Sequence, residues 1–391
     1  MLLPGRGRGP RWRLPELDAS IPFWMYIIGF PLLLGPLVTL HELGHYLVGR
    51  WFGVKADAFS VGFGKELAGF TDKRGTRWKL SALPLGGYVQ FKGDMNPASA
   101  PDRRNRASAA PQRDGTFQNA PLWQRALIVA AGPATNILVT LAIFTAFFIA
   151  VGTPVASDAE RQLTVAGFAD DSPAARAGMR LGDRIVSIDG KPMADFRGLQ
   201  EAVMLYPGKR LAVTVERDGA RVTLPITAAS VEQADRFGNV SKIGLIGVRP
   251  AGASFAFERQ DPLTSLALAT SYSVDIVRMM VTGIGQILSG ERSVKELGGP
   301  VKIAKFSGEQ LSLGPLAFIN FVALISLNLA FINLLPIPGL DGGHLAFYAA
   351  EAVRRKPVGP RGLEFAYRSG MALVLMLMLF VTFNDLVSLV G

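Results

Sequence analysis

Long apolar runs separated by polar and basic segments dominate the hydrophobic pattern of this 391-residue chain. About 20 apolar residues in helical form cross the hydrocarbon core of a bilayer. Four runs meet that length, and they predict transmembrane helices over residues 21–49, 121–151, 315–345 and 370–391. A fifth run, within residues 251–314, is interrupted by Asp275 and Arg278. It predicts an amphipathic helix at the membrane interface followed by a connector, not another span.

The polar segment over residues 50–120 contains short stretches of alternating apolar and polar residues. A turn signal at Asp72-Lys-Arg-Gly75 lies between them. The pattern predicts a membrane-associated β-hairpin, followed by a linker rich in proline, alanine, serine and arginine. The segment over 346–369, with its arginines and lysine, is predicted to be a second loop on the same side of the membrane.

Residues 152–250 have the pattern of a soluble α+β domain. Alternating stretches at 210–217 and 221–226 are joined by Asp218-Gly219, a hairpin-turn signal. A helix start at Ser172-Pro173 precedes them, and the whole resembles a PDZ domain. The resemblance implies that peptide ends bind by adding a strand to a sheet edge, with a plain size filter or spacer as the alternative. The predicted fold class is thus a mainly α-helical membrane protein with four transmembrane helices, a membrane-associated β-hairpin region and one inserted PDZ-like α+β domain.

Composition and charge agree with a membrane protein. Hydrophobic residues make up 49% of the chain, and the mean hydropathy is +0.28. The net charge is +10, but the basic residues flank apolar runs, which favours contact with the lipid bilayer over nucleic acid. A basic segment over residues 1–20 precedes the first span and mimics a signal peptide; no cleavage is expected, because the apolar run is long and lacks a small-residue cleavage site. The absence of cysteine excludes disulfides, thiolate zinc sites and cysteine nucleophiles.

Two of the three histidines lie in His41-Glu42-Leu43-Gly44-His45, inside the first apolar run. Residues four apart share one face of a helix, so His41 and His45 can ligate one zinc ion. Glu42, beside them, can act as general base on a water activated by the metal. Polar groups within a membrane are costly and usually functional. The alternative is a purely structural histidine pair packed against neighbouring helices. In that case Glu42 would be a buried carboxylate with no functional role.

A catalytic zinc site needs a third protein ligand. The candidate carboxylates near apolar runs are Asp275, Asp341 and Asp385. With four spans, the histidines and Asp341 both lie near cytoplasmic helix ends, which favours Asp341. This topology makes the segments 50–120 and 346–369 cytoplasmic by the positive-inside tendency and puts the inserted domain on the opposite side, with the basic N-terminus as an exception.

Two further polar residues accompany these motifs. Asn136, in Ala131-Gly-Pro-Ala-Thr-Asn136 of the second span, predicts either a packing contact between helices or a role beside the active site. His344, after Asp341, is expected to be a helix cap or an outer group of the site and not a ligand.

The chain combines three features: the HExxH motif on an apolar helix, the PDZ-like domain between the second and third spans, and the motif Asn333-x-x-Pro-x-Pro-x-x-Asp341-Gly. Together they resemble the site-2 protease family, and within it the branch of the bacterial regulator of sigma-E protease. The match covers nearly the whole chain after the first twenty residues. The chain departs from the best-known members in having room for one PDZ domain instead of two.

The resemblance implies an intramembrane zinc metalloprotease of the bacterial inner membrane that uses Zn²⁺ and cleaves transmembrane proteins, such as anti-sigma factors or signal-peptide remnants. Its ligands would be His41, His45 and Asp341, and its acid/base Glu42. Asn333 matches a position that helps to hold the substrate, and Asn136 is a second candidate for positioning substrate. One alternative is an inactive metal-binding scaffold that recruits partners, but such a scaffold would not need Glu42. The other is a membrane-anchored protease of soluble peptides, which would place the motif outside the apolar run.

Overall fold

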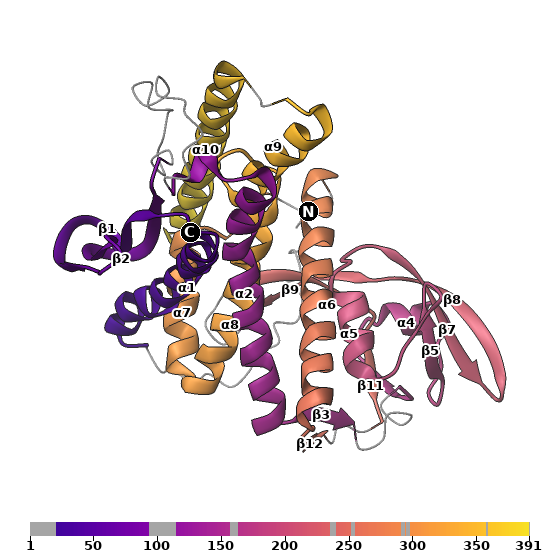
Figure 1. The fold of residues 1–391 in the computed structure, drawn as a ribbon. Coiled ribbons are helices and arrows are strands. Elements are labelled where there is room, and N and C mark those ends of the chain that lie inside the picture. The colour runs from indigo at the N-terminus through magenta and orange to yellow at the C-terminus, as the bar shows by residue number, and fades with distance from the viewer. Residues whose placement is uncertain are drawn as a thin grey trace, which may run out of the picture. The chain divides into compact units, whose positions relative to one another are not determined.

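The computed structural model describes residues 21–93, 115–156, 163–234, 240–251, 255–290, 294, 298–356 and 359–390. The chain divides into two compact units (Figure 1). The membrane unit consists of Ile21–Ala150 and Asp261–Gly391, and the inserted unit of Val151–Gln260. The basic segment 1–20 and most of the predicted linker lie outside the described residues.

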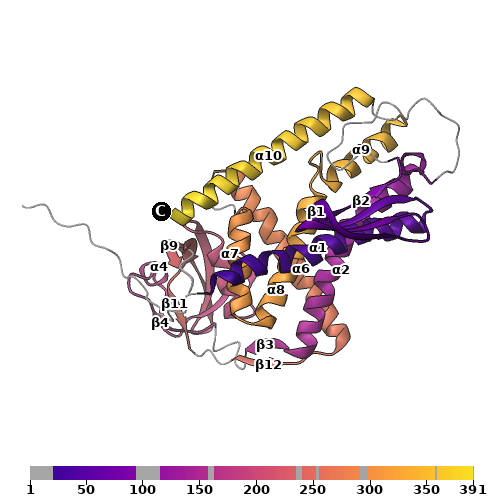
Figure 2. The same ribbon diagram turned by 90° about the vertical axis from the view of Figure 1, so that its left-hand side faces the viewer.

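Four helices in the described part of the chain are long and apolar enough to cross a membrane. They are α1 (Phe23–Trp51), α2 (Leu122–Ala150), α8 (Pro315–Leu334) and, within α10 (Pro360–Val390), the stretch Phe365–Val387. Figure 2 shows α10 as one long, unbroken helix. The prediction of four helices that are long and apolar enough to span a membrane is therefore confirmed.

Small and hydroxylated residues bring these helices close together. A Cβ atom added to Gly44 of α1 would lie 2.6 Å from the carbonyl oxygen of Ala131 on α2, so only glycine permits this spacing. On the other side of α2, Thr140 donates a hydrogen bond to the Ala323 carbonyl of α8. Ser326 of α8 donates in return to the backbone carbonyl of Asn136. The two hydroxyl groups thus join α2 to α8 by hydrogen bonds that need no water as partner.

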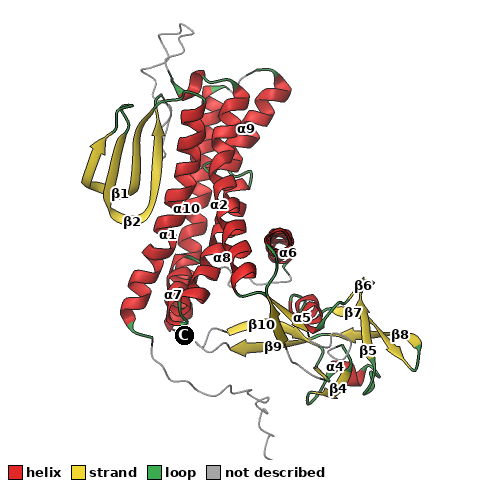
Figure 3. Cartoon of the chain, turned by 60° about the horizontal axis from the view of Figure 1, so that its bottom comes forward, coloured by secondary structure: helices red, strands yellow, loops and turns green. Residues whose placement is uncertain are grey.

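The predicted hairpin is formed by two long strands, β1 (Ala56–Thr71) and β2 (Arg77–Phe91). The register pairs Val61 with Gly87 and also with Leu80, so the strands bend and form more pairings than a simple hairpin would. Residues 87–91 of β2 pair with β1 on one side only. Their other side faces α1, and Figure 3 shows the sheet beside that helix. A short 3-10 helix, η2 (Phe117–Asn119), then precedes α2.

The segment after α8 differs from the sequence prediction. The predicted span over 315–345 is interrupted: α8 ends at Leu334, and α9 (Asp341–Arg354) begins after a turn that contains Pro336 and Pro338. Proline lacks a backbone donor, so it ends the helical hydrogen bonding here. The loop expected over 346–369 is mostly helical as well, because α9 continues through its first part and α10 begins at Pro360.

The predicted amphipathic helix is α6 (Pro262–Leu288), and it is not among the four candidate spans. Its buried residues Ala269 and Ile276 pack with Phe144 of α2 and Leu327 of α8. The connector after it contains a helix that the sequence did not predict, α7 (Pro300–Ser312). It approaches α1 through Gly308, where an added Cβ would lie 2.9 Å from the Tyr26 Cα.

The inserted unit is an α+β domain. Its elements are β3 (Thr153–Ala156), β4 (Val165–Phe168), α4 (Pro173–Arg176), β5 (Arg184–Ile188), β6 (Lys191–Pro192), α5 (Phe196–Met204), β7 (Arg210–Arg217), β8 (Ala220–Thr227), β9 (Ala229–Ala234), β10 (Val240–Leu245), β11 (Val248–Pro250) and β12 (Phe255–Glu258). The largest sheet has the order β6-β5-β7-β8, and Val213, Val215 and Ile226 lie in its apolar core. Asp218 and Gly219 both have positive φ, as the predicted hairpin turn requires.

Candidate metal centre

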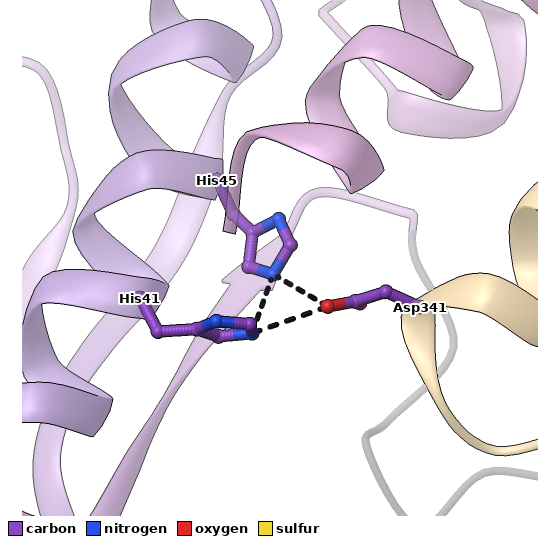
Figure 4. Close-up of side chains that lie close together, drawn as sticks. All are labelled: His41, His45 and Asp341. Carbon is purple, nitrogen blue, oxygen red and sulfur yellow. Dashed lines mark hydrogen bonds and ion pairs between the residues drawn. The ribbon is translucent and has the colours of Figure 1, made fainter. Parts of the chain in front are cut away.

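The two histidines of α1 and the aspartate at the start of α9 converge on one point (Figure 4). His41 and His45 are buried, with 6% and 8% of their surface exposed. Their Nε2 atoms are 3.2 Å apart, because residues four apart on a helix stand one above the other. The Oδ2 atom of Asp341 lies 3.1 Å from the Nε2 of His41 and 3.6 Å from that of His45. Among the described residues, these three form a group that could hold a metal ion.

The three distances fit a zinc ion. Ligand atoms that lie about 2.0–2.1 Å from a tetrahedral zinc are about 3.3–3.4 Å from one another. The observed separations of 3.1, 3.2 and 3.6 Å bracket that value. The Asp341 Oδ2 atom is also buried and accepts no hydrogen bond from the described residues. A buried carboxylate oxygen is costly without a partner, and a divalent cation between the three side chains would supply one.

The neighbouring face of α2 makes room for both imidazoles. A Cβ atom added to Gly132 would lie 2.5 Å from the Cε1 of His45 and 2.8 Å from the Cε1 of His41. One turn before Gly132, the Ile128 carbonyl lies 2.8 Å from the Nδ1 of His45. One turn after it, the Asn136 amide lies 3.2 Å from the Nδ1 of His41. The small residues here predicted close helix packing, and Asn136 a packing contact or a role beside the site; neither prediction identified the room that Gly132 leaves for the rings.

Glu42 lies on the side of α1 that faces the β-hairpin. Its Oε2 atom accepts a 3.1 Å hydrogen bond from the backbone N–H of Val89. Val89 belongs to the part of β2 that pairs with β1 on one side only. The carboxylate of Glu42 therefore lies between the helix that carries both histidines and an edge of β2 that pairs with no second strand among the described residues.

The turn after α8 positions Asp341. Side chains at Gly342 and Gly343 would collide with the carbonyl oxygens of Leu334, Leu335 and Ile337. The two glycines therefore let the first turn of α9 fold back against the end of α8. The paired glycines after Asp341 are the sequence signal that could have predicted this close approach.

The structure separates the three candidate carboxylates. Asp341 joins the histidines. Asp275 is instead exposed on α6 and pairs with Arg278. Asp385 is buried on α10, where it accepts hydrogen bonds from the backbone N–H groups of Gly299 and Lys302 at the start of α7.

His344 and the two asparagines lie in different surroundings. The Nδ1 of His344 is 2.8 Å from the hydroxyl of Tyr367 on α10, and the residue is outside the metal group formed by the described side chains. Asn333 is half-buried near the end of α8, and no hydrogen bond joins its side chain to the histidines or Asp341 within the described part of the chain. Asn136 contacts His41 directly and is fully buried.

Comparison with known proteins agrees with this geometry. The sequence profile of peptidase family M50 matches residues 29–377. A protein of Rhizobium meliloti named "Putative zinc metalloprotease" is 43% identical over 381 residues, which cover 97% of this chain and 99% of that protein. A Brucella suis protein with the same description is 44% identical over 92% of this chain and 94% of its own. Metalloprotease MmpA of Caulobacter vibrioides is 34% identical over 94% of this chain and 96% of its own.

The profile covers most of the chain, the relatives match almost their full length, and the histidines and Asp341 form a group that fits the metal those relatives are named for. The chain therefore belongs to peptidase family M50 and is a membrane-embedded zinc metalloprotease.

Proposed function

We propose that this enzyme hydrolyses peptide bonds within or near the transmembrane segments of other membrane proteins. The observation that carries the proposal is the position of the metal group. His41 and His45 are buried on α1, a helix long and apolar enough to span the membrane, and lie within its last three turns. A site at that depth meets substrate that is itself in the membrane. Anti-sigma factors and signal-peptide remnants are the substrate classes that we expect.

His41, His45 and Asp341 would hold the zinc, and Glu42 would move the protons. When bound, the zinc supplies Lewis-acid chemistry: it polarises the scissile carbonyl and makes a water acidic enough to lose a proton near neutral pH. Glu42 Oε2 accepts that proton as general base. As the water loses this proton, its oxygen bonds to the scissile carbonyl carbon. Glu42 then delivers the proton to the amide nitrogen, the C–N bond breaks, and the products are a carboxylate and an amine.

The open edge of β2 would hold the substrate in extended form. A transmembrane helix hides its carbonyl groups in its own hydrogen bonds, so it must unwind locally before cleavage. An unwound segment regains backbone hydrogen bonds by adding to a strand edge. Residues 87–91 offer such an edge, and the Val89 N–H already points at Glu42. Asn333 is half-buried near the end of α8, the helix that precedes Asp341. We expect its side chain to contact the substrate as well.

Exposed apolar side chains on the hairpin support contact with lipid. They are Phe63, Leu67, Phe70, Leu80 and Leu83, each more than 40% exposed. An apolar surface of this kind is unfavourable in water and favourable in a bilayer. The hairpin would therefore lie at or within the membrane surface, beside the metal group.

We further propose a location in the bacterial inner membrane, with the metal group near the cytoplasmic face and the inserted unit outside. The basic residues of the segments 50–120 and 346–369 support this orientation. The inserted unit would act as a PDZ-like domain that filters substrates by size or binds peptide ends. Single cysteines test the orientation in this cysteine-free chain. Arg104→Cys should be labelled only from the cytoplasm and Asp218→Cys only from outside; labelling of both from one side would contradict it.

Glu42→Gln tests the catalytic proposal. The substitution keeps the size of the side chain but removes its ability to accept a proton, and it leaves the three zinc ligands unchanged. We expect full zinc content and a loss of cleavage of at least about 10²–10⁴-fold, the range that a positioned acid/base contributes. The measurement compares membrane-protein fragments in cells that express the wild type or the variant, together with zinc analysis of the purified chains.

Glu201→Gln is the matched control. It makes the same chemical change on α5, where the carboxylate is half-exposed and pairs with Arg197, and it should cleave like the wild type. Cleavage of a transmembrane substrate by Glu42→Gln within a few-fold of wild type, with zinc bound, would refute the proposal.

A further inference from the structure

One face of α2 supports the metal group through three residues spaced four apart. Ile128 presents its carbonyl to the Nδ1 of His45, Gly132 leaves room for both rings, and Asn136 presents its side chain to the Nδ1 of His41. This spacing lines the three residues up along one side of the helix. Each histidine therefore has a partner on α2 behind its ring, while its Nε2 atom faces Asp341.

The protons on the two rings follow from the metal. A histidine ligand is a neutral imidazole, with a lone pair on the ligating nitrogen and one N–H on the other. Because Nε2 faces the metal group, Nδ1 must carry the hydrogen in both residues. His45 donates this hydrogen to the Ile128 carbonyl, which can only accept. His41 needs an acceptor of the same kind, and within the described part of the chain its Nδ1 contacts the Asn136 side chain.

The Asn136 side chain can meet that need in only one of its two orientations. With its amide nitrogen toward His41, two hydrogen-bond donors face each other, and the buried Oδ1 has no partner among the described residues. A half-turn of the amide exchanges oxygen and nitrogen without changing the shape of the side chain. Oδ1 then accepts the hydrogen bond from the Nδ1–H of His41, which removes both the donor conflict and the unpaired oxygen.

We infer that Asn136 is a positioning residue for the metal centre: its Oδ1 fixes the tautomer and the ring plane of His41 so that Nε2 points at the zinc. This inference rests on the proposed assignment of His41 as a ligand, and it replaces the expectation that Asn136 positions substrate. Asn136 is fully buried, so its side chain faces no open space in which a substrate could lie.

The backbone at Asn136 is held firmly enough for this role. Its carbonyl oxygen accepts hydrogen bonds from Thr140 on α2 and from Ser326 on α8. The residue is thereby anchored to two helices before its side chain reaches the ring. Partners of this kind, which hold the ligand and not the metal, typically change metal affinity by about 10–100-fold when they are removed.

The test compares two substitutions at position 136 in the purified full-length chain. Asn136→Leu fills the same space without an acceptor, and Asn136→Asp retains one. Zinc affinity is measured by competition with a chelator, and the visible spectrum of the cobalt(II)-substituted chain reports on ligand geometry. We expect Asn136→Leu to bind zinc about 10–100-fold more weakly and to change the cobalt spectrum, whereas Asn136→Asp stays within about threefold of wild type.

Ser273→Ala is the control, because it removes a buried hydroxyl that donates to the Ala269 carbonyl within α6 and contacts neither Asn136 nor the histidines. It should leave zinc affinity and the cobalt spectrum unchanged. Wild-type zinc affinity in Asn136→Leu, an equal loss in Asn136→Asp, or an equal loss in Ser273→Ala would each overturn the inference. These measurements involve no cleavage, so they are independent of the Glu42→Gln experiment, whose failure would refute the protease mechanism and leave the zinc result standing.

Discussion

Gly132→Ala tests whether the space behind the imidazoles is required for the metal. The added methyl group would lie 2.5 Å from the Cε1 of His45 and 2.8 Å from the Cε1 of His41, whereas ordinary contacts begin at 3.4 Å. The Nε2 of His45 lies closer still to the added methyl group, so the ring must move by about 1 Å or more. Metal–ligand distances tolerate about 0.2 Å, so the movement takes the Nε2 of His45 out of ligating range.

The fold should survive this change while the metal is lost. The atoms in conflict are the ends of side chains, which can rotate, and alanine is favoured over glycine inside a helix by about 0.5–1 kcal/mol. Loss of a metal ligand weakens zinc binding more than loss of a residue that only hydrogen-bonds to a ligand. We therefore expect zinc affinity to fall by more than about 100-fold. Elemental analysis of the purified chain gives the zinc content, and thermal unfolding with and without added zinc gives the linkage between metal and stability.

Gly285→Ala makes the same substitution inside α6, where an added Cβ would contact nothing within 4 Å. It should bind zinc like the wild type and be equally or slightly more stable. If Gly132→Ala bound one zinc per chain with an affinity close to that of the control, the close approach of α2 to the histidines would not be what the metal requires.

Two further predictions concern buried carboxylates away from the metal. The Arg217 guanidinium, which donates two hydrogen bonds to Asp183, lowers the pKa of that carboxyl below its ordinary value of 3.8. The pair therefore stabilises the folded inserted unit above that pH, and its contribution is lost as the pH falls through the lowered pKa. Asp183→Asn should lower the free energy of unfolding of the inserted unit by about 2–3 kcal/mol at neutral pH, and by progressively less below about pH 4. Hydrogen exchange of β7 measures this free energy. A loss that does not change with pH would contradict the prediction. Asp385→Ala should free the N–H groups of Gly299 and Lys302 and lower stability by about 2–3 kcal/mol in thermal unfolding, whereas exposed Asp275→Ala should change it little.

Much of the membrane unit was predictable because its signals are local. A spanning helix needs a long apolar run, and all four runs formed such helices. The spacing of His41 and His45 placed both on one face of α1 without any tertiary information. The turn at Asp218-Gly219 likewise follows from two residues that tolerate positive φ.

Other features depend on contacts between residues far apart in the chain. The sequence favoured Asp341 over Asp275 and Asp385 by a topological argument, but only the fold brings it within 3.6 Å of both histidines, three hundred residues earlier. Helix α7 was missed and α9 was taken largely as loop because both are too short and too polar to stand out among apolar runs of spanning length.

The sequence by itself determined which runs are long and apolar enough to span a membrane and that His41 and His45 share one helix face, because those properties depend on residues a few positions apart. Only the tertiary structure decided that Gly132 makes room for the rings, that Asn136 lies behind His41 and that the β2 edge meets Glu42. These contacts join different elements, and no periodicity within one segment encodes which residues of another segment it will touch.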